Sequence, residues 1–110
     1  MNMSFSLTTA QFRDRTKTVT RRLGWNKLKR GQEFTAIVKG MGLKKGEKVE
    51  ILGRCRVISN RREPLNAISK PDCIREGFPD LTANEFVEMF CKHNGCKPDQ
   101  EVSRIEFEYL

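Results

Sequence analysis

A lysine and a threonine that lie three positions apart, Lys17 and Thr20, are the residues of this sequence best suited to chemistry. A threonine hydroxyl is a weak nucleophile at its free pKa and needs a nearby base to take its proton. A lysine amine can be that base only when it is partly neutral, and burial and nearby cations both lower its pKa. Arg21 and Arg22 follow directly and could supply those cations. The segment is therefore coherent as a nucleophile with its base.

The same segment, residues 17–22, also has a simpler interpretation, in which a basic strand contacts phosphate groups or water. Lys-Thr-x-Thr is a weak pattern by itself, and spacing alone favours the basic strand. Residue chemistry thus leaves two functions open for this segment, which are catalysis on a bound ligand and contact with a nucleic acid.

Local signals predict the elements that hold these side chains. Residues 5–7 are expected to form a short strand. Thr8, followed three residues later by a glutamine, resembles a capping box and predicts a short helix to about Arg15. Residues 18–20 are β-branched and favour an extended chain. Lys17 is therefore expected at the end of the helix or in the turn after it, with Thr20 on the next strand.

The middle of the chain is predicted to be mostly extended. Residues 29–32 form a turn, and residues 34–38 alternate as a half-buried strand. Residues 40–46 hold three glycines and two lysines and are expected to be a flexible basic loop. A long strand follows over residues 48–60, with a bend predicted at Gly53.

Two helices and a final strand complete the prediction. Ser69, with a proline in the first turn, begins a short helix that ends near Gly77. Thr82 and the glutamate three residues later form a capping box for a second helix, which ends at Gly95. Residues 104–110 alternate sharply, which is typical of an edge or barrel strand with one wet face. This order favours an α+β domain in which helices pack around a small closed or nearly closed β-barrel.

Size and charge limit the choice of function. The chain has 110 residues, which suits one domain over residues 1–110, and its 37% hydrophobic content excludes a disordered chain. The formal net charge is +7, and the basic residues concentrate between Arg13 and Arg62. Such a field attracts phosphates or other anionic partners, although it also serves solubility alone.

The cysteines and the apolar segments predict the cellular setting. No window approaches the length of a membrane span, and the N-terminus lacks a signal-peptide pattern, so we expect a cytoplasmic protein without membrane partners. Its four cysteines are then expected to be reduced thiols. Cys91, His93 and Cys96 could ligate zinc, but their spacing fits no standard finger, and no metal is expected. His93 is expected instead to interact with the terminal carbonyls of its helix.

The segment around the lysine and threonine resembles the signature of the ASCH domain family, Gly-x-Lys-x-x-Thr-x-Arg. Lys17, Thr20 and Arg22 match in register, whereas Arg15 replaces the signature glycine. Further similarity in the turn at residues 28–32 and in the last strand extends the resemblance over nearly the whole chain. It implies a PUA-like fold, a small β-barrel with flanking helices that is common in RNA-binding and RNA-modifying proteins.

Small bacterial members of that family are N(4)-acetylcytidine amidohydrolases that use a lysine, a threonine and a glutamate. The resemblance places the first two roles on Lys17 and Thr20. The stretch of residues 72–78 resembles the region of the acid and places that role on Glu76, with Glu63 as the competitor. No cofactor is implied.

The resemblance also implies a mechanism. Lys17 deprotonates Thr20, whose oxygen attacks the acyl carbonyl, and Glu76 protonates the departing amine. Arg22 or backbone N–H groups would stabilise the oxyanion. The residues expected around the substrate are Arg21, Arg22, Trp25, Glu63 and Phe78. The two aromatic rings could stack on the base, although such rings more often serve packing.

Three functions therefore remain open at the level of sequence. The first is an amidohydrolase that releases cytidine and a carboxylic acid from N(4)-acylated cytidine, with a nucleoside or RNA as substrate. The second is an RNA-binding PUA-like module without catalysis. The third is a ribonuclease, which would lack the usual pair of histidines. A monomer is favoured, although nothing in the sequence fixes the oligomeric state.

Overall fold

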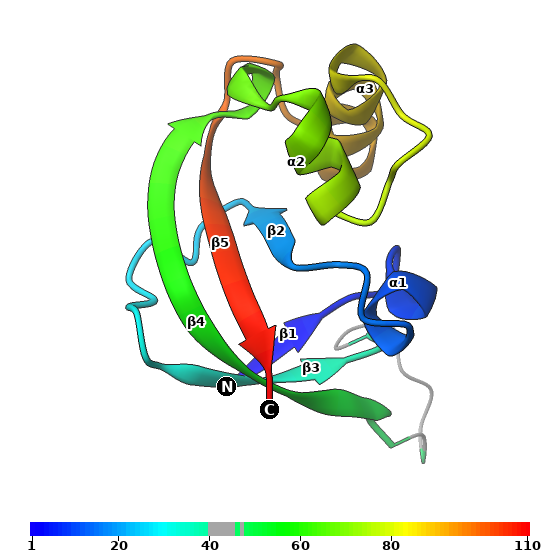
Figure 1. Cartoon of the computed structure of the whole chain (residues 1–110), viewed down its shortest axis with the longest axis vertical. Helices are drawn as coiled ribbons and strands as arrows, with labels where there is room; N and C mark the ends of the chain where they lie inside the picture. The colour runs from blue at the N-terminus through cyan, green and yellow to red at the C-terminus, as the bar shows by residue number, and fades with distance from the viewer. Residues whose placement is uncertain (40–45, 47) are drawn as a thin grey trace.

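The computed structural model describes residues 1–39, 46 and 48–110, and its framework is a five-stranded sheet in the order β1-β3-β4-β5-β2 (Figure 1). The strands are β1 (Asn2–Ser4), β2 (Val19–Arg22), β3 (Glu33–Ile37), β4 (Ile51–Pro64) and β5 (Glu101–Tyr109). The helices are α1 (Thr9–Arg13), α2 (Lys70–Arg75) and α3 (Ala83–Asn94), with a 3₁₀ turn, η1 (Leu65–Ala67), after β4. Most of the predicted basic loop at residues 40–46 lies outside the described residues.

The pairing of the strands confirms the α+β class. β1 pairs parallel to β3, and every other pairing is antiparallel. β1 and β2 are the edges of the sheet, and within the described ranges no ladder joins them, so closure into a barrel is not confirmed. The sheet nevertheless curves strongly, because the long strand β4 bends as it passes from β3 to β5 (Figure 1).

Two irregularities in β4 account for its curvature. The register against β3 shifts between Ala36 and Ile37, which leaves Leu52 without a partner in that ladder. The register against β5 shifts at Ile58. An extra residue on one strand bends that strand and increases its twist. The bend predicted at Gly53 therefore lies one residue from the first irregularity, and the second was not foreseen.

The core consists of two clusters of buried residues. The first is aromatic and joins α1 to β1, β3 and β5 through Phe5, Phe12, Phe34 and Phe107, whose ring centroids lie 5.0–6.3 Å apart. Burial of such rings is a large part of the stability of a small domain. The second cluster packs α3 against η1 and the start of β5. Residues of both clusters, Phe5 and Phe86 among them, line the pocket described below.

The two C-terminal helices form as the sequence predicts. The hydroxyl of Ser69 accepts the N–H of Asp72 at the start of α2. Thr82 and Glu85 form both hydrogen bonds of the capping box at α3, and Gly95 ends that helix with φ +66°. Among the described residues, no helix is long and apolar enough to cross a membrane.

The N-terminal prediction is wrong in detail. The first strand is β1 and not residues 5–7. The backbone N–H of Phe5 still donates to Ile37 O (2.9 Å), but its side chain packs into the aromatic core, and the strand ends before it. Thr8 precedes α1, but its side chain makes no capping hydrogen bond, and the helix spans five residues. Thr8 is buried, and its backbone N–H donates to Phe5 O (3.0 Å).

The last strand also departs from expectation. β5 is not an edge, because it lies between β4 and β2. Arg104, expected on a wet face, is only 6% exposed, whereas Glu108 on the same face is exposed. The difference arises because α2 crosses this end of the sheet and places the carboxylate of Asp72 against the guanidinium of Arg104.

Candidate active site

Lys17 lies in the connection between α1 and β2, and its backbone is held from three sides. Its N–H donates to Gln11 O (3.3 Å), and its carbonyl accepts the hydroxyl of Tyr109. The next residue, Thr18, donates its N–H to Arg75 O at the end of α2 (2.8 Å). The predicted position after the helix is correct, and these contacts direct the side chain of Lys17 inward.

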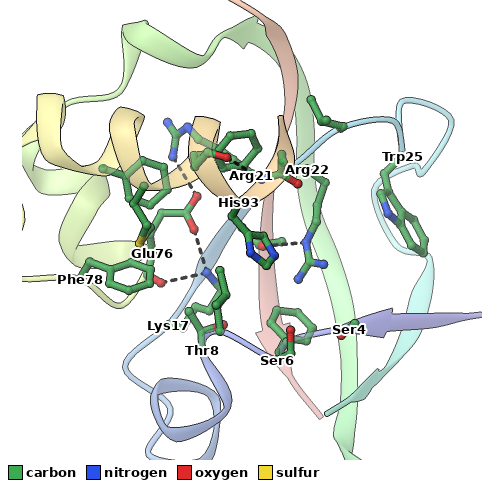
Figure 2. Close-up of a pocket in the computed structure, with 18 residues that line it drawn as sticks. Ser4, Ser6, Thr8, Lys17, Arg21, Arg22, Trp25, Glu76, Phe78 and His93 are labelled. Atoms are coloured by element: carbon green, nitrogen blue, oxygen red, sulfur yellow. Dashed lines mark hydrogen bonds and ion pairs between the residues drawn. The ribbon is translucent and has the colours of Figure 1, made fainter. Parts of the chain in front are cut away.

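The amine of Lys17 is buried against Glu76. Its Nζ donates to Glu76 Oε1 (2.8 Å) and to the backbone carbonyl of Glu76 (2.9 Å), and both side chains are 3% exposed (Figure 2). Burial is the main cause that lowers the pKa of Lys17. The charge and hydrogen bond of Glu76 oppose this shift, and the charges of Arg22 and Arg21 add to it. The net shift of the pKa is in the direction that a lysine base requires.

Thr20 lies on a strand, β2, as predicted. It pairs with Ile105 of β5 and is 3% exposed. Residues two apart on a strand share a face, which brings the guanidinium of Arg22 to the hydroxyl of Thr20. Arg22 Nε donates to Thr20 Oγ1 at 3.0 Å. A cationic donor at this oxygen favours its deprotonated form.

Arg22 itself lies over the ring of Phe5, with 4.7 Å from its central carbon to the ring centroid. Burial lowers the pKa of Arg22 to about 10, so the side chain remains a cation at neutral pH. In the described part of the chain, Arg22 has no carboxylate within salt-bridge distance. Its positive charge is thus available to a ligand or to a developing oxyanion.

A pocket of about 300 Å³ unites these groups. Seven of the eight residues predicted for the site line it, from the segment 17–25 and from the turn after α2: Lys17, Thr20, Arg21, Arg22, Trp25, Glu76 and Phe78. Phe78 packs edge-on against Phe86 (centroids 5.9 Å apart), and the carbonyl of Trp25 accepts a hydrogen bond from Asn60 (2.8 Å). Both aromatic rings are half-buried and present surface to the pocket.

Glu63 is the predicted residue that lies apart from the pocket. Its carboxylate accepts from Arg21 Nη2 (3.0 Å) and from Arg61 Nε (3.0 Å), and it is not among the pocket-lining residues. Lys17 contacts Glu76 and not Glu63. The geometry therefore favours Glu76 as the acidic member of the site.

Arg21 was expected to face the substrate, but carboxylates occupy its guanidinium. It donates to Asp72 (2.6 Å), Glu63 (3.0 Å) and Glu76 (3.3 Å), and its side chain is 1% exposed. Because one of these carboxylates is Glu76, Arg21 can hold the acid in place.

Asp72 is the residue at the centre of this network that sequence reasoning missed. Its carboxylate accepts from Arg104 Nε (2.7 Å) and Nη2 (2.9 Å), from Arg21 (2.6 Å) and from Arg75 (2.8 Å). These hydrogen bonds, led by that of Arg104, hold the pKa of Asp72 far below its usual value. The available signal was spacing, since Asp72 on α2 and Glu76, the C-cap of that helix, are four positions apart and so lie on one face.

His93 and its neighbour Asn94 were also missed. His93, expected to interact with the carbonyls at the end of α3, lines the pocket instead (Figure 2). It follows Met89 and Phe90 at helical spacing, and these two also line the pocket. That spacing was the signal for its direction. No group of three potential metal ligands occurs in the described ranges.

Gly77 lets the chain turn directly after Glu76. It has φ +98°, and a Cβ here would lie 2.8 Å from Gln11 Cγ, a contact too close to keep. Gly77→Ala is therefore expected to lower the free energy of unfolding by about 1–3 kcal/mol, as measured by urea titration. Gly31→Ala is the matched control, because its φ is +89° but nothing lies within 4 Å. An equal loss in both variants would show that the contact with Gln11 is unimportant.

The fold has a counterpart among solved structures. No protein family model and no curated protein matches the chain. The crystal structure of protein EF3133 from Enterococcus faecalis V583, described with the family model DUF984, is similar with a TM-score of 0.65. The match covers 96% of this chain and 71% of that one at 18% identity. At this identity the likeness concerns the fold alone.

Proposed function

We propose that this chain is an ASCH-type domain of PUA-like fold that hydrolyses N(4)-acylated cytidine and releases cytidine and a carboxylic acid. The observation that carries the proposal is the buried contact between Lys17 and Glu76 in the same pocket as Thr20. The pocket volume of about 300 Å³ lies at the lower end of the range for small-molecule sites and suits a nucleoside.

The burial of Lys17 favours catalysis over the alternative in which residues 17–22 form a basic strand that contacts phosphate groups. A lysine that contacts phosphate groups must present its amine at the surface, whereas Lys17 is 2% exposed and its amine faces a carboxylate. A buried ion pair gives little net stability, because the loss of hydration offsets the attraction. A buried lysine with a lowered pKa in a pocket is typical of a group with a chemical task.

In the proposed first step, Lys17 and Glu76 together hold one proton. With the amine of Lys17 neutral and Glu76 protonated, Lys17 takes the proton of Thr20 Oγ1, and this oxygen attacks the acyl carbon. Glu76 gives its proton to N4 as the carbon–nitrogen bond breaks. Arg22, 3.0 Å from Thr20 Oγ1, is placed to donate to the oxyanion. The products are cytidine and an ester of Thr20.

The second step reverses these roles. Glu76, now a carboxylate, takes a proton from the water that attacks the ester, and the ammonium of Lys17 protonates the departing Thr20 oxygen. The pair returns to its starting state. In the described residues no hydrogen bond joins Lys17 Nζ to Thr20 Oγ1, but such catalytic contacts are often long without substrate and tighten when it binds.

Turnover of the substrate tests the proposal. The purified protein is incubated with N(4)-acetylcytidine, and deacylation is followed by the change in ultraviolet absorbance. Absence of turnover by wild type would refute the enzyme. Salt-dependent affinity for RNA without turnover would instead support the RNA-binding module, which the net charge of +7 also favours.

The identity of the acid is tested by two isosteric variants. Glu76→Gln is expected to lower kcat by about 10²- to 10⁴-fold, because an amide can neither give nor take the proton. Glu63→Gln is the matched control, since Glu63 also contacts Arg21 but does not line the pocket. Its kcat should stay close to that of wild type. The opposite ranking would move the acidic role to Glu63.

A further inference from the structure

The end of α3 brings two thiols together beside the pocket. Gly95 adopts a left-handed conformation, and the N–H groups of Gly95 and Cys96 both donate to Cys91 O (2.8 and 3.3 Å). The chain therefore folds back, and Cys96 Sγ lies 3.8 Å from Cys91 Sγ. Both cysteines are half-buried, so small reagents can reach them.

We propose that Cys91 and Cys96 are an oxidisable dithiol, whose disulfide closes a ring around two residues of the pocket wall, His93 and Asn94. A disulfide requires the sulfurs to approach to about 2.05 Å, a shift that rotation of the two side chains can largely supply. Cysteines whose sulfurs lie far apart in a folded protein cannot form a disulfide by side-chain rotation alone. This site is independent of the proposed hydrolysis.

The reaction balances with either of two ordinary oxidants. A thiolate attacks hydrogen peroxide to give a sulfenic acid and hydroxide, and the second thiol then forms the S–S bond as water leaves. With a small disulfide such as oxidised glutathione, the first attack releases one glutathione thiolate and the second attack releases another. A dithiol reductant restores both thiols. Burial, followed by the contact with Cys96, raises the pKa of Cys91, so oxidation should be faster in alkaline solution.

The other two cysteines lie in different surroundings and serve as internal controls. Cys55 and Cys73 are 0% exposed and lie in different core clusters. Burial raises the pKa of Cys55 to about 12 and also raises that of Cys73. Buried thiols of this kind are inert. Oxidation should therefore be confined to Cys91 and Cys96.

The position of the ring connects oxidation to the pocket. His93 points into the pocket from the last turn of α3 (Figure 2), and Asn94 donates its side-chain amide to Phe90 O (3.0 Å) within the same turn. Closing the disulfide rotates the two cysteine side chains and ties together the ends of the segment that carries His93 and Asn94. The pocket wall formed by His93 and Asn94 should change with it.

Alkylation of the folded full-length protein tests the dithiol. After equilibration with oxidised glutathione, alkylation and mass spectrometry should show that both half-buried thiols are protected and that residues 91–96 contain an internal disulfide. Cys91→Ser and Cys96→Ser should each abolish the internal disulfide and leave the remaining thiol either free or bound to one glutathione, while Cys73→Ser should retain the internal disulfide. Continued alkylation of both thiols, or disulfides only between molecules, would overturn the proposal.

The imidazole of His93, the single histidine of the chain, reports on the pocket wall. Its NMR signals should differ between the dithiol and disulfide forms of wild type and should not respond to oxidant in Cys96→Ser. Identical signals in both forms would refute the connection to the pocket. Because neither measurement uses turnover, both remain decisive if the chain hydrolyses no acylcytidine.

Discussion

Replacement of Lys17 by methionine should lower kcat for N(4)-acetylcytidine by about 10²- to 10⁴-fold, the contribution of a positioned general base. Methionine keeps most of the apolar stem but has no amine. KM should change far less, because the hydrogen bonds of the amine go to Glu76 and the proposal gives the amine no contact with the base of the substrate. Steady-state kinetics on the folded variant measure the changes in kcat and KM separately. Lys29→Met, at an exposed lysine, is the control.

The single variant leaves the carboxylate of Glu76 without its main partner, so a loss of folding must be separated from a loss of chemistry. The double variant Lys17→Met with Glu76→Gln removes both charges of the pair, so neither is left without its partner. We expect it to fold and to remain inactive. A folded double variant with the activity of wild type would refute the catalytic pair.

The pH dependence follows from the same amine. The proposed first step requires that Lys17 and Glu76 together hold one proton, so kcat should fall in alkaline solution as the pair loses this proton. Since burial lowers the pKa of Lys17, this fall should lie below the ordinary lysine value of 10.5. The stability of the fold depends on the same shift. Between the lowered pKa and 10.5 the unfolded lysine binds more protons than the folded one, so this group adds stability as pH rises. Lys17→Met should lose both trends.

Thr20→Ala removes the proposed nucleophile and should leave no acyl-enzyme. Thr20→Ser retains a hydroxyl and should keep measurable turnover, whereas Thr20→Val keeps the shape and should not. Mass spectrometry of rapidly quenched wild type would detect the acyl group on Thr20. Undiminished turnover by Thr20→Ala would show that the nucleophile lies elsewhere, even if the chain is an amidohydrolase.

The parts of this molecule that sequence predicts well are those determined by short-range contacts. The caps of α2 and α3 involve residues within three positions of each other, and the glycine at the end of α3 needs only its own backbone freedom. The position of Lys17 after α1 likewise follows from the β-branched run that begins at Thr18. Such signals do not depend on how the elements pack.

The errors arise where distant segments meet. The short helix at Thr9 lacks its predicted capping bond, and Phe5 just before it leaves the predicted strand and packs into the aromatic core. Arg104 is buried because α2, some thirty residues away, brings Asp72 to it at 2.7 Å (|i−j| = 32). The apposition of Lys17 and Glu76 spans 59 positions, and the sequence favoured Glu76 only by a short local resemblance, with Glu63 as its competitor. Only the fold separates the two carboxylates.

The largest effect on stability is expected at Asp72. Asp72→Asn should lower the free energy of unfolding by about 3–5 kcal/mol, because it removes the charge that compensates two buried guanidinium groups, Arg21 and Arg104. The exposed contact with Arg75 adds little, since solvent screens it. Urea unfolding at neutral pH measures the loss.

Acid should reproduce this loss in the wild-type protein. Because the pKa of Asp72 is lowered on folding, its contribution is present above the unfolded pKa of 3.8 and is lost as pH falls toward the lower folded value. Asp72→Asn should flatten that part of the stability profile. Glu33→Gln is the control, because Glu33 also pairs with two arginines, Arg54 and Arg56, but at the surface (42% exposed). It should cost at most about 1 kcal/mol. Equal losses in both variants would show that burial of the network around Asp72 has no energetic importance.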